Sequence, residues 1–230
     1  MDTGLLPLRS PRTLWALTLV VVVFSVADRS VATQTRGRAA QARPEVRTEA
    51  PKINCPQVLG EGMQTKRTFC DVLIGRDPAA GIIIPLPPHT GDVTLTFDLH
   101  NRQLYSEELS KTSRGYRRYT AVVGVLTMDN TPISKAYIQS EFRTAADLFD
   151  RVSSGTASSG MKAVAPTGLE SISMTVPAEE NGVSIIGLEL TEVRLDGKDQ
   201  FFAVGRPVAV LSNVMIEYRP APARPPARRR

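Results

Sequence analysis

Hydrophobic and polar residues alternate without interruption along residues 93–100, which read VTLTFDLH. Valine, leucine and phenylalanine occupy the odd-numbered positions, and the even-numbered positions hold Thr94, Thr96, Asp98 and His100. Because successive side chains of a strand point to opposite faces, this spacing predicts a β-strand with one buried face. We interpret the polar row on the other face as the solvent-exposed side of a half-buried strand.

Similar patterns recur along the chain, separated by residues typical of turns. Residues 121–126 are almost all apolar, which is typical of a central strand covered on both faces. Further strand patterns cover residues 71–75, 81–84, 133–142, 171–176, 183–195, 196–202 and 207–218. Together they predict a fold that is mostly β, a single antiparallel β-sandwich or jelly roll with one short helix.

The one expected helix covers residues 144–155, with the sequence TAADLFDRVSSG. Thr144 is suited to the N-cap, and Asp147 stands at the position of the capping-box acid. Leu148 and Val152, four residues apart, would form its apolar face, and a glycine ends the pattern. Its length suits a connection between strands rather than a layer of the fold.

The beginning of the chain has the pattern of a secretory signal. Arg9 and Arg12 precede the apolar segment 14–24, and small residues follow it up to Ala27. The apolar segment is shorter than the about 20 residues of a membrane-spanning helix, which disfavours a permanent anchor. We therefore expect a secreted or periplasmic protein. Its expected parts are a signal peptide (1–27), a disordered linker (28–51), a β-sandwich domain (52–218) and a disordered Pro/Arg-rich tail (219–230).

The chain carries 28 Lys and Arg against 23 Asp and Glu, but the excess of positive charge lies at its ends. Residues 1–51 hold seven arginines and four acids, and residues 219–230 hold five arginines and no acid, which leaves 16 basic and 19 acidic residues for 52–218. This distribution argues against nucleic-acid binding. The tail is either simply solvated or attaches the protein to an anionic surface. The arginines that would make that attachment are Arg224, Arg228, Arg229 and Arg230.

Cys55 and Cys70 are the only two cysteines of the chain. In an exported protein such a pair forms a disulfide more often than a metal site or a reactive thiol. A catalytic cysteine needs a nearby base, and both histidines lie well downstream. We therefore predict a Cys55–Cys70 disulfide that clamps the first segment of the domain.

His89, Asp98 and His100 are the candidate metal ligands. Asp98 and His100 share one strand face, and His89 would have to come from the preceding turn. Alternating polar residues are the ordinary pattern of a half-exposed strand, so we predict no metal site and no cofactor. The sequence also contains no phosphate-binding loop, zinc-protease helix or serine-nucleophile elbow.

Residues 116–119 stand where the central strand begins and are the candidate ligand site. Aromatic rings and guanidinium groups are suited to stack on, and hydrogen-bond to, a sugar or an acidic ligand. The site would be formed by Tyr116, Arg117, Arg118 and Tyr119. The alternative is an ordinary strand end whose long side chains reach solvent.

The same region carries a resemblance to a known family. LTFDLHNR (95–102), followed by YRRYTAVVGV (116–125), resembles galactose-binding-like jelly rolls, in particular the carbohydrate-binding modules attached to glycoside hydrolases. In those modules a strand ending in Asp-Leu precedes a Tyr-basic-aromatic strand that runs into Val-Gly-Val. The resemblance implies a β-sandwich that binds glycans through loops at one edge.

These patterns favour a non-enzymatic, exported β-sandwich that binds a glycan or another envelope or extracellular protein. A second hypothesis is a structural or assembly protein of the cell envelope that docks through a sheet edge or the basic tail. A third is a hydrolase whose cleft is not visible in the linear sequence.

Overall fold

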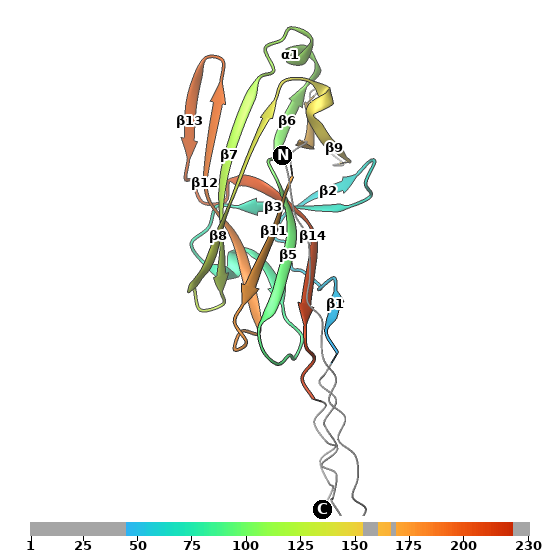
Figure 1. Cartoon of the computed structure of the whole chain (residues 1–230). Coiled ribbons are helices and arrows are strands. Elements are labelled where there is room, and N and C mark those ends of the chain that lie inside the picture. Colours follow the sequence, from blue (N-terminus) through green and yellow to red (C-terminus); the bar gives the residue numbers. More distant parts are fainter. Residues whose placement is uncertain (1–44, 154–160, 167–168, 223–230) are drawn as a thin grey trace, which may run out of the picture. The chain divides into compact units, whose positions relative to one another are not determined.

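The structure, a computed structural model, describes residues 45–153, 161–166 and 169–222, and strands dominate it (Figure 1). The predicted signal peptide and the four tail arginines lie outside the described residues. In chain order the elements are β1 (Arg47–Glu49), β2 (Val58–Gly62), β3 (Thr68–Leu73), η1 (Pro78–Ala80), β4 (Ile82–Pro85), β5 (Val93–His100), β6 (Gln103–Ser106), α1 (Glu107–Lys111), β7 (Arg117–Thr127), β8 (Pro132–Phe142), η2 (Ala145–Asp147), β9 (Leu148–Ser153), β10 (Met161–Pro166), β11 (Glu170–Val176), β12 (Gly182–Arg194), β13 (Gly197–Phe201) and β14 (Pro207–Tyr218).

The strands form two antiparallel sheets, which confirms the predicted β-sandwich. The larger sheet has nine strands, in the order β11-β5-β14-β3-β2-β9-β10-β6, with β1 beside β14. The smaller sheet has five strands, in the order β13-β12-β7-β8, with β4 beside β12. The apolar strand β7 lies between β12 and β8, as its sequence predicted for a central strand.

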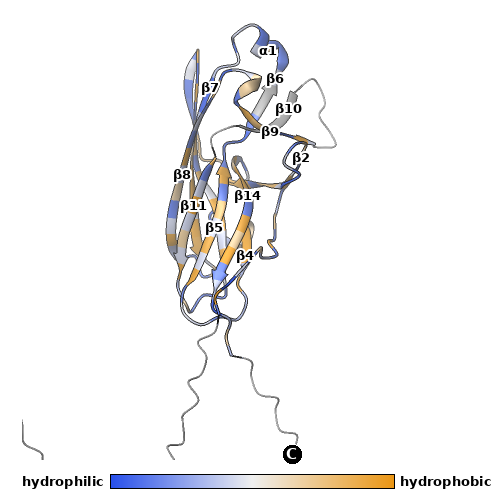
Figure 2. Cartoon of the chain, turned by 45° about the vertical axis from the view of Figure 1, so that its right-hand side comes forward, coloured by the Kyte–Doolittle hydropathy of each residue, from blue (hydrophilic) through white to orange (hydrophobic). Residues whose placement is uncertain are grey.

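The main core lies between the sheets and follows the alternation seen in the sequence. The odd-numbered residues of β5 from Val93 to Leu99 are at most 1% exposed. On β8, Ala136 and Ile138 are buried while Tyr137 between them is exposed. Figure 2 shows the hydrophobic stretches of β5, β14 and β4 in orange, whereas α1 is blue and buries no residue. Each fully buried Leu, Val or Phe side chain contributes about 1.5–3 kcal/mol to folding.

The larger sheet curls back on itself at the end where β5 stops, and the chain connection between β5 and β6, instead of a strand pairing, completes the ring. β6 continues the chain two residues after β5 and pairs with β10, and the ladder then returns through β9, β2, β3 and β14 to β5. This closed end encloses a second, smaller apolar cluster. Its members are Leu59, Phe69, Val152 and Val210, with Phe149 packed against them.

The polar side chains on the second face of β5 are therefore not solvent-exposed along the whole strand. Thr94 and Thr96 are half-buried, but Asp98 is only 7% exposed and His100 is fully buried. The interpretation of this row as solvent-exposed was wrong at these last two positions. Alternation along one strand shows that its two faces differ, but it does not show that a second layer covers the polar face.

The prediction of a helix over residues 144–155 was also wrong for the residues that the structure describes. A short 3₁₀ turn covers Ala145–Asp147, and the chain then continues as strand β9. The cap itself forms, since the Thr144 backbone N–H donates to Asp147 Oδ2 at 2.7 Å. Asp150 and Val152 both point inward at strand spacing, so tertiary burial overrides the local helical preference.

The short α-helix lies elsewhere, in a polar segment that the sequence analysis left without a predicted element. Ser106 is the N-cap of α1, and its side chain accepts a hydrogen bond from the Leu109 backbone N–H at 3.4 Å. Glu107 and Glu108 occupy the first turn and Lys111 the last, which suits the helix dipole. With no apolar face to bury, this helix gives no periodic signal.

The folded domain extends beyond the predicted boundaries of 52–218 at both ends. Arg47–Glu49 lies in the predicted linker but pairs as β1 with the end of β14. The Tyr218 hydroxyl donates to Glu49 Oε1 at 3.1 Å. Just beyond β14, the Arg219 carbonyl accepts a hydrogen bond from the Thr90 N–H at 2.8 Å.

Both ends of the described chain therefore leave from the same end of β14. β14 begins at Pro207, which lines a pocket together with Leu109 of α1. It ends at Tyr218 beside β1 (Figure 1). Twelve residues at the usual strand rise span roughly 35 Å. Within the described ranges, no helix is long and apolar enough to cross a membrane.

Cys55 and Cys70 form the predicted disulfide, with a Cα–Cα distance of 5.9 Å. Cys70 lies in β3 and is buried in the main core, while Cys55 precedes β2. The neighbouring Asn54 makes a β-bridge to Ile83 of β4. The disulfide thus clamps the first segment of the domain, as predicted.

Reducing this disulfide is expected to lower the free energy of unfolding by about 3 kcal/mol, because the bond closes a loop of about 15 residues in the unfolded chain. Urea unfolding with and without reductant measures the effect. A Cys55→Ser/Cys70→Ser variant is the control and is expected to show no response to reductant. An unchanged unfolding midpoint in wild-type protein with two titratable thiols would contradict the expectation.

Candidate functional site

The four residues predicted as a ligand site do not share one surface. Side chains alternate along β7, so Arg117 and Tyr119 lie on the face toward the larger sheet. Arg118 lies on the opposite face, in register with Glu141 of β8. Tyr116 precedes β7 and lines a different pocket. Strand geometry thus splits the tetrapeptide into three environments.

A pocket of about 400 Å³ lies between the two sheets at the α1 end, and we call it the end pocket. The β5–β6 connection, α1, β7, β12 and the beginning of β14 supply its walls. Its lining residues are Arg102, Ser106, Leu109, Arg117, Tyr119, Leu190, Glu192, Arg206 and Pro207. The volume lies within the range of about 300–1,000 Å³ that is usual for small-molecule sites.

Arg117 and Glu192 form an ion pair in the wall of the end pocket. Arg117 Nε lies 3.1 Å from Glu192 Oε1, and the two side chains are 23% and 15% exposed. Arg117 Nη1 also donates to the Tyr116 carbonyl at 2.8 Å. These contacts fix the guanidinium group, so one edge of the pocket has a preorganised donor and acceptor side by side.

Arg102 forms the second ion pair and connects the end pocket to the closed end of the larger sheet. Its Nη1 lies 3.1 Å from Oδ2 of Asp71, which is fully buried and also accepts a hydrogen bond from Gln57 Nε2 at 2.9 Å. Burial raises the pKa of Asp71, although Arg102 and Gln57 act in the opposite direction. Asp71 Oδ1 has no hydrogen-bond partner among the described residues.

Arg206 differs from the other two arginines of the end pocket. Its guanidinium carbon lies 3.4 Å from the centre of the Phe201 ring. Among the described residues, no carboxylate lies within ion-pairing distance of it. Stacking on an aromatic ring leaves the donors at the rim of the guanidinium plane free.

Tyr119 supplies a protonated hydroxyl group to the end pocket. Burial and the nearby Glu192 raise the pKa of the Tyr119 hydroxyl well above its ordinary value, against the opposing effect of Arg117, Arg194 and Arg206. The hydroxyl group is therefore a hydrogen-bond donor at any physiological pH. No hydrogen bond from another described residue engages it. The end pocket thus offers charge and hydrogen-bond recognition.

Tyr116 lines a second pocket of about 460 Å³ on the other side of α1. The Arg143 guanidinium carbon lies 5.6 Å from the centre of the Tyr116 ring, and the Tyr116 hydroxyl donates to Glu141 at 3.4 Å. The remaining lining residues are Ser110, Ser113, Thr144 and Leu195. This pocket holds an aromatic ring and a cation, but its hydroxyl and guanidinium are already engaged at the surface.

The sequence analysis missed Arg102, Glu192 and Arg206, which complete the end pocket. They come from three segments of the chain that only the tertiary fold brings together. Glu192 meets Tyr119 through the β7–β12 register, which no local pattern encodes. The one available signal was the sequence Gly-Arg-Pro at 205–207, where a charged residue sits in a turn directly before an apolar strand.

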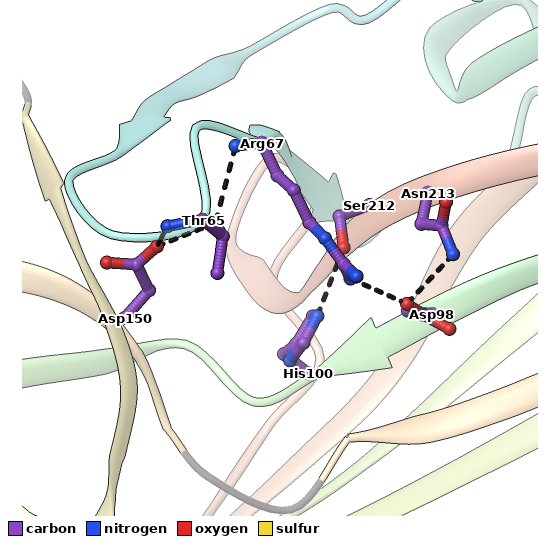
Figure 3. Close-up of polar contacts among 7 residues, drawn as sticks. All are labelled: Thr65, Arg67, Asp98, His100, Asp150, Ser212 and Asn213. Atoms are coloured by element: carbon purple, nitrogen blue, oxygen red, sulfur yellow. Dashed lines mark hydrogen bonds and ion pairs between the residues drawn. The ribbon is translucent and has the colours of Figure 1, made fainter.

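Asp98 and His100 belong to a buried polar cluster on the other face of the larger sheet (Figure 3). His100 Nε2 lies 3.1 Å from Ser212 Oγ, and the Phe69 and Phe149 rings pack around the imidazole at centroid distances of 5.6 and 4.7 Å. Asp98 Oδ2 accepts two hydrogen bonds, one from Arg67 Nη1 at 2.8 Å and one from Asn213 Nδ2 at 3.2 Å.

His100 is neutral at physiological pH. Burial is the main cause that lowers its pKa to about 4; Asp98 opposes the shift and Arg67 adds to it. Its Nδ1 has no hydrogen-bond partner among the described residues. The imidazole therefore behaves as a core side chain that tolerates no charge.

Asp150 holds the β2–β3 turn over this cluster (Figure 3). Its carboxylate accepts hydrogen bonds from the Gln64 N–H, the Thr65 N–H and the Thr65 hydroxyl, at 3.0, 2.9 and 2.7 Å. Burial alone would raise the pKa of Asp150, but these hydrogen bonds hold it below its ordinary value. A Cβ at Gly62 would lie 2.2 Å from the carboxylate, so only glycine permits this approach.

The structure does not bring the three candidate metal ligands together. His89 lies in the β4–β5 connection, where Nδ1 is 2.8 Å from the Pro87 carbonyl and the backbone bridges to Pro220. Asp98 is occupied by Arg67 and Asn213. Within the described part of the chain, no group of three or more His, Cys, Asp or Glu residues could hold a metal ion.

No protein-family model and no curated protein matches the chain. Among solved structures, the chain is similar to the N-terminal CBM22-1 and GH10 modules of a Clostridium thermocellum endo-1,4-β-D-xylanase complexed with xylohexaose (13% identity, 79% of this chain, 27% of that chain, TM-score 0.25). It is also similar to the catalytic domain of a GH87 α-1,3-glucanase in complex with nigerose (10% identity, 79% of this chain, 28% of that chain, TM-score 0.25). A third similar structure is the infectious bursal disease virus VP2 subviral particle (12% identity, 79% of this chain, 42% of that chain, TM-score 0.24).

The chain spans less than half the length of each of these proteins. The three share 10–13% sequence identity with it, and they are different kinds of protein: a xylanase, a glucanase and a viral particle. At these TM-scores they support no argument about function.

The free energy of unfolding is expected to decrease as the pH falls from about 6.5 to about 4, because the unfolded chain then binds a proton at His100 that the folded protein excludes. The loss from this one group amounts to about 3 kcal/mol. Urea unfolding at a series of pH values measures it. A His100→Gln variant should lose this part of the pH dependence, whereas His89→Gln should keep it. Parallel curves for wild type and His100→Gln would contradict the assignment.

Proposed function

We propose that this protein is an exported, non-catalytic β-sandwich module that binds a glycan in the end pocket. The observation that carries the proposal is the convergence of Tyr119, the Arg117–Glu192 pair and Arg206 around one open cavity between the sheets. Sugar hydroxyl groups need paired donors and acceptors at fixed positions. The end pocket offers them in a wall whose side chains are already held in place.

Export is supported by the disulfide. Both cysteines of the chain are paired, which indicates an oxidising, extracellular type of environment. The predicted signal over residues 1–27 completes this part of the proposal, with a secreted or periplasmic location. Expression with and without residues 1–27, followed by fractionation and mass measurement, tests both export and cleavage after Ala27.

The proposal of a non-catalytic role rests on where the reactive side chains lie. Ser212 and His100 are in contact, but both are buried beneath the β2–β3 turn, where a substrate has no access. A nucleophile and its base must reach the reacting bond. A panel of ester, glycoside and phosphate substrates tests the hydrolase alternative, and turnover that is lost in Ser212→Ala would favour it.

A structural or assembly role is the second candidate, and β8 is the observation that favours it. Pro132–Phe142 is an edge strand of the smaller sheet, and its outer edge pairs with no strand among the described residues. Tyr137 on its outer face is 61% exposed. An edge of this length can accept a strand from an envelope or extracellular protein. Co-purification of a stoichiometric protein partner, with no saturable glycan binding, would favour this candidate.

Attachment of the tail arginines to an anionic surface stays a prediction. Arg219 and Ala221 make backbone hydrogen bonds to Thr90 and Pro88, so a truncation should begin after residue 222. Such a variant removes Arg224, Arg228, Arg229 and Arg230 while leaving the domain contacts in place. Unchanged binding to anionic vesicles and envelope fractions at low salt would exclude this role.

Tyr119→Phe is expected to weaken glycan binding about tenfold, because it removes one pocket hydrogen bond worth about 1–1.5 kcal/mol and keeps the ring that packs in the core. A glycan array identifies the ligand, and calorimetric titration measures the change. Tyr218→Phe is the matched control, since it removes a tyrosine hydroxyl at the other end of β14. Equal affinity of Tyr119→Phe and wild type would exclude the end pocket as the glycan site.

A further inference from the structure

The charges around the end pocket do not balance. Its lining contains three arginines, Arg102, Arg117 and Arg206, and one acid, Glu192. The buried Asp71 stands directly behind Arg102 and neutralises it, and Glu192 neutralises Arg117. One positive charge therefore remains without a counterion among the described residues, and it belongs to Arg206.

Arg206 is exposed, yet the chain holds it in place. The Arg206 carbonyl accepts a hydrogen bond from the Ile74 N–H at 2.8 Å, and the Gly205 N–H donates to the Ile74 carbonyl at 2.8 Å. Gly205 has a φ of +84°, which suits glycine and turns the chain toward β14. The Phe201 ring then supports the guanidinium plane. Binding a ligand here costs little side-chain ordering.

The geometry points to an acidic glycan as the ligand of the end pocket, with a uronic acid carboxylate held by Arg206 and sugar hydroxyls held by Tyr119 and the Arg117–Glu192 pair. This inference rests on the proposed function. A guanidinium fork pairs with a carboxylate through two parallel hydrogen bonds, which a neutral sugar cannot offer. A ligand with one carboxylate in the pocket also restores the charge balance.

Neighbouring groups favour a glycan over an acidic peptide as the source of the carboxylate. Glu192 stands beside Tyr119 across the β7–β12 register and keeps an acceptor in the pocket wall. A sugar hydroxyl can donate to this acceptor, whereas the second carboxylate of an acidic peptide would meet like charge. The pocket therefore suits a molecule with one anionic group surrounded by hydroxyl groups.

The experiment compares galacturonic acid, which carries one carboxylate, with its methyl ester, which keeps the hydroxyl groups and has no charge, by calorimetric titration of the full chain. Wild-type protein is expected to bind the acid at least tenfold more tightly than the ester. Arg206→Gln should lose that preference, so that the ratio of its affinities for the acid and the ester falls to about one. The matched control is Arg118→Gln, which removes the same charge from the outer face of β7 and should behave as wild type. Thermal unfolding of both variants verifies that they remain folded.

The outcomes separate this inference from the proposed function. Equal binding of acid and ester, or an unchanged preference in Arg206→Gln, overturns the acidic-glycan inference and leaves glycan binding in place. Saturable binding of neutral glycans alone on an array also overturns the acidic-glycan inference and leaves glycan binding in place. Binding of an oligoglutamate peptide as tight as that of galacturonic acid assigns the carboxylate to a protein partner and overturns the inference. Absence of saturable binding to any glycan overturns both.

Discussion

The structure depends on the ladder β5–β14–β3, because these three strands are buried on both faces where the larger sheet closes on itself. In β14, Ala209 and Leu211 face the main core, whereas Val210 between them belongs to the smaller apolar cluster. One strand thus serves two cores at once. A mutation here would disturb both, and the polar residues of the ladder must find partners inside the protein.

These partners link the buried polar face to the end pocket. Arg102 lines the pocket while binding Asp71, which lies on the same buried face of the larger sheet as Phe69. Asp150 and the β2–β3 turn cover this face and exclude water from it. The buried polar residues of β3 and β5 therefore act as structural support, whereas the end pocket lies between the sheets and is open.

The sequence predicted the elements whose signal lies in one strand. The apolar row of β5, the central strand β7, the alternation of β8 and the disulfide are as expected. The errors arise where packing against residues from distant segments determines whether a side chain is buried. His100 is covered by residues about 30 and 50 positions away, and β9 is a strand because Asp150 and Val152 are needed inside. The sequence predicted only part of the end pocket for the same reason. Arg117 and Tyr119 lie close together in the sequence and were predicted as site residues. The other three charged residues of the pocket come from distant segments that the tertiary fold brings together: Arg102, Glu192 and Arg206.

The direction of β14 has a practical consequence. The described chain begins beside the last residues of this strand and ends just after them, while Arg206 precedes its first residue. Attaching the protein close to residue 45 or residue 222, on a sensor surface or within a larger assembly, places the attachment at the end of β14 opposite Arg206. Attachment at these two positions therefore leaves the end pocket open, whereas a reporter inserted in the loop before β14 would lie beside it.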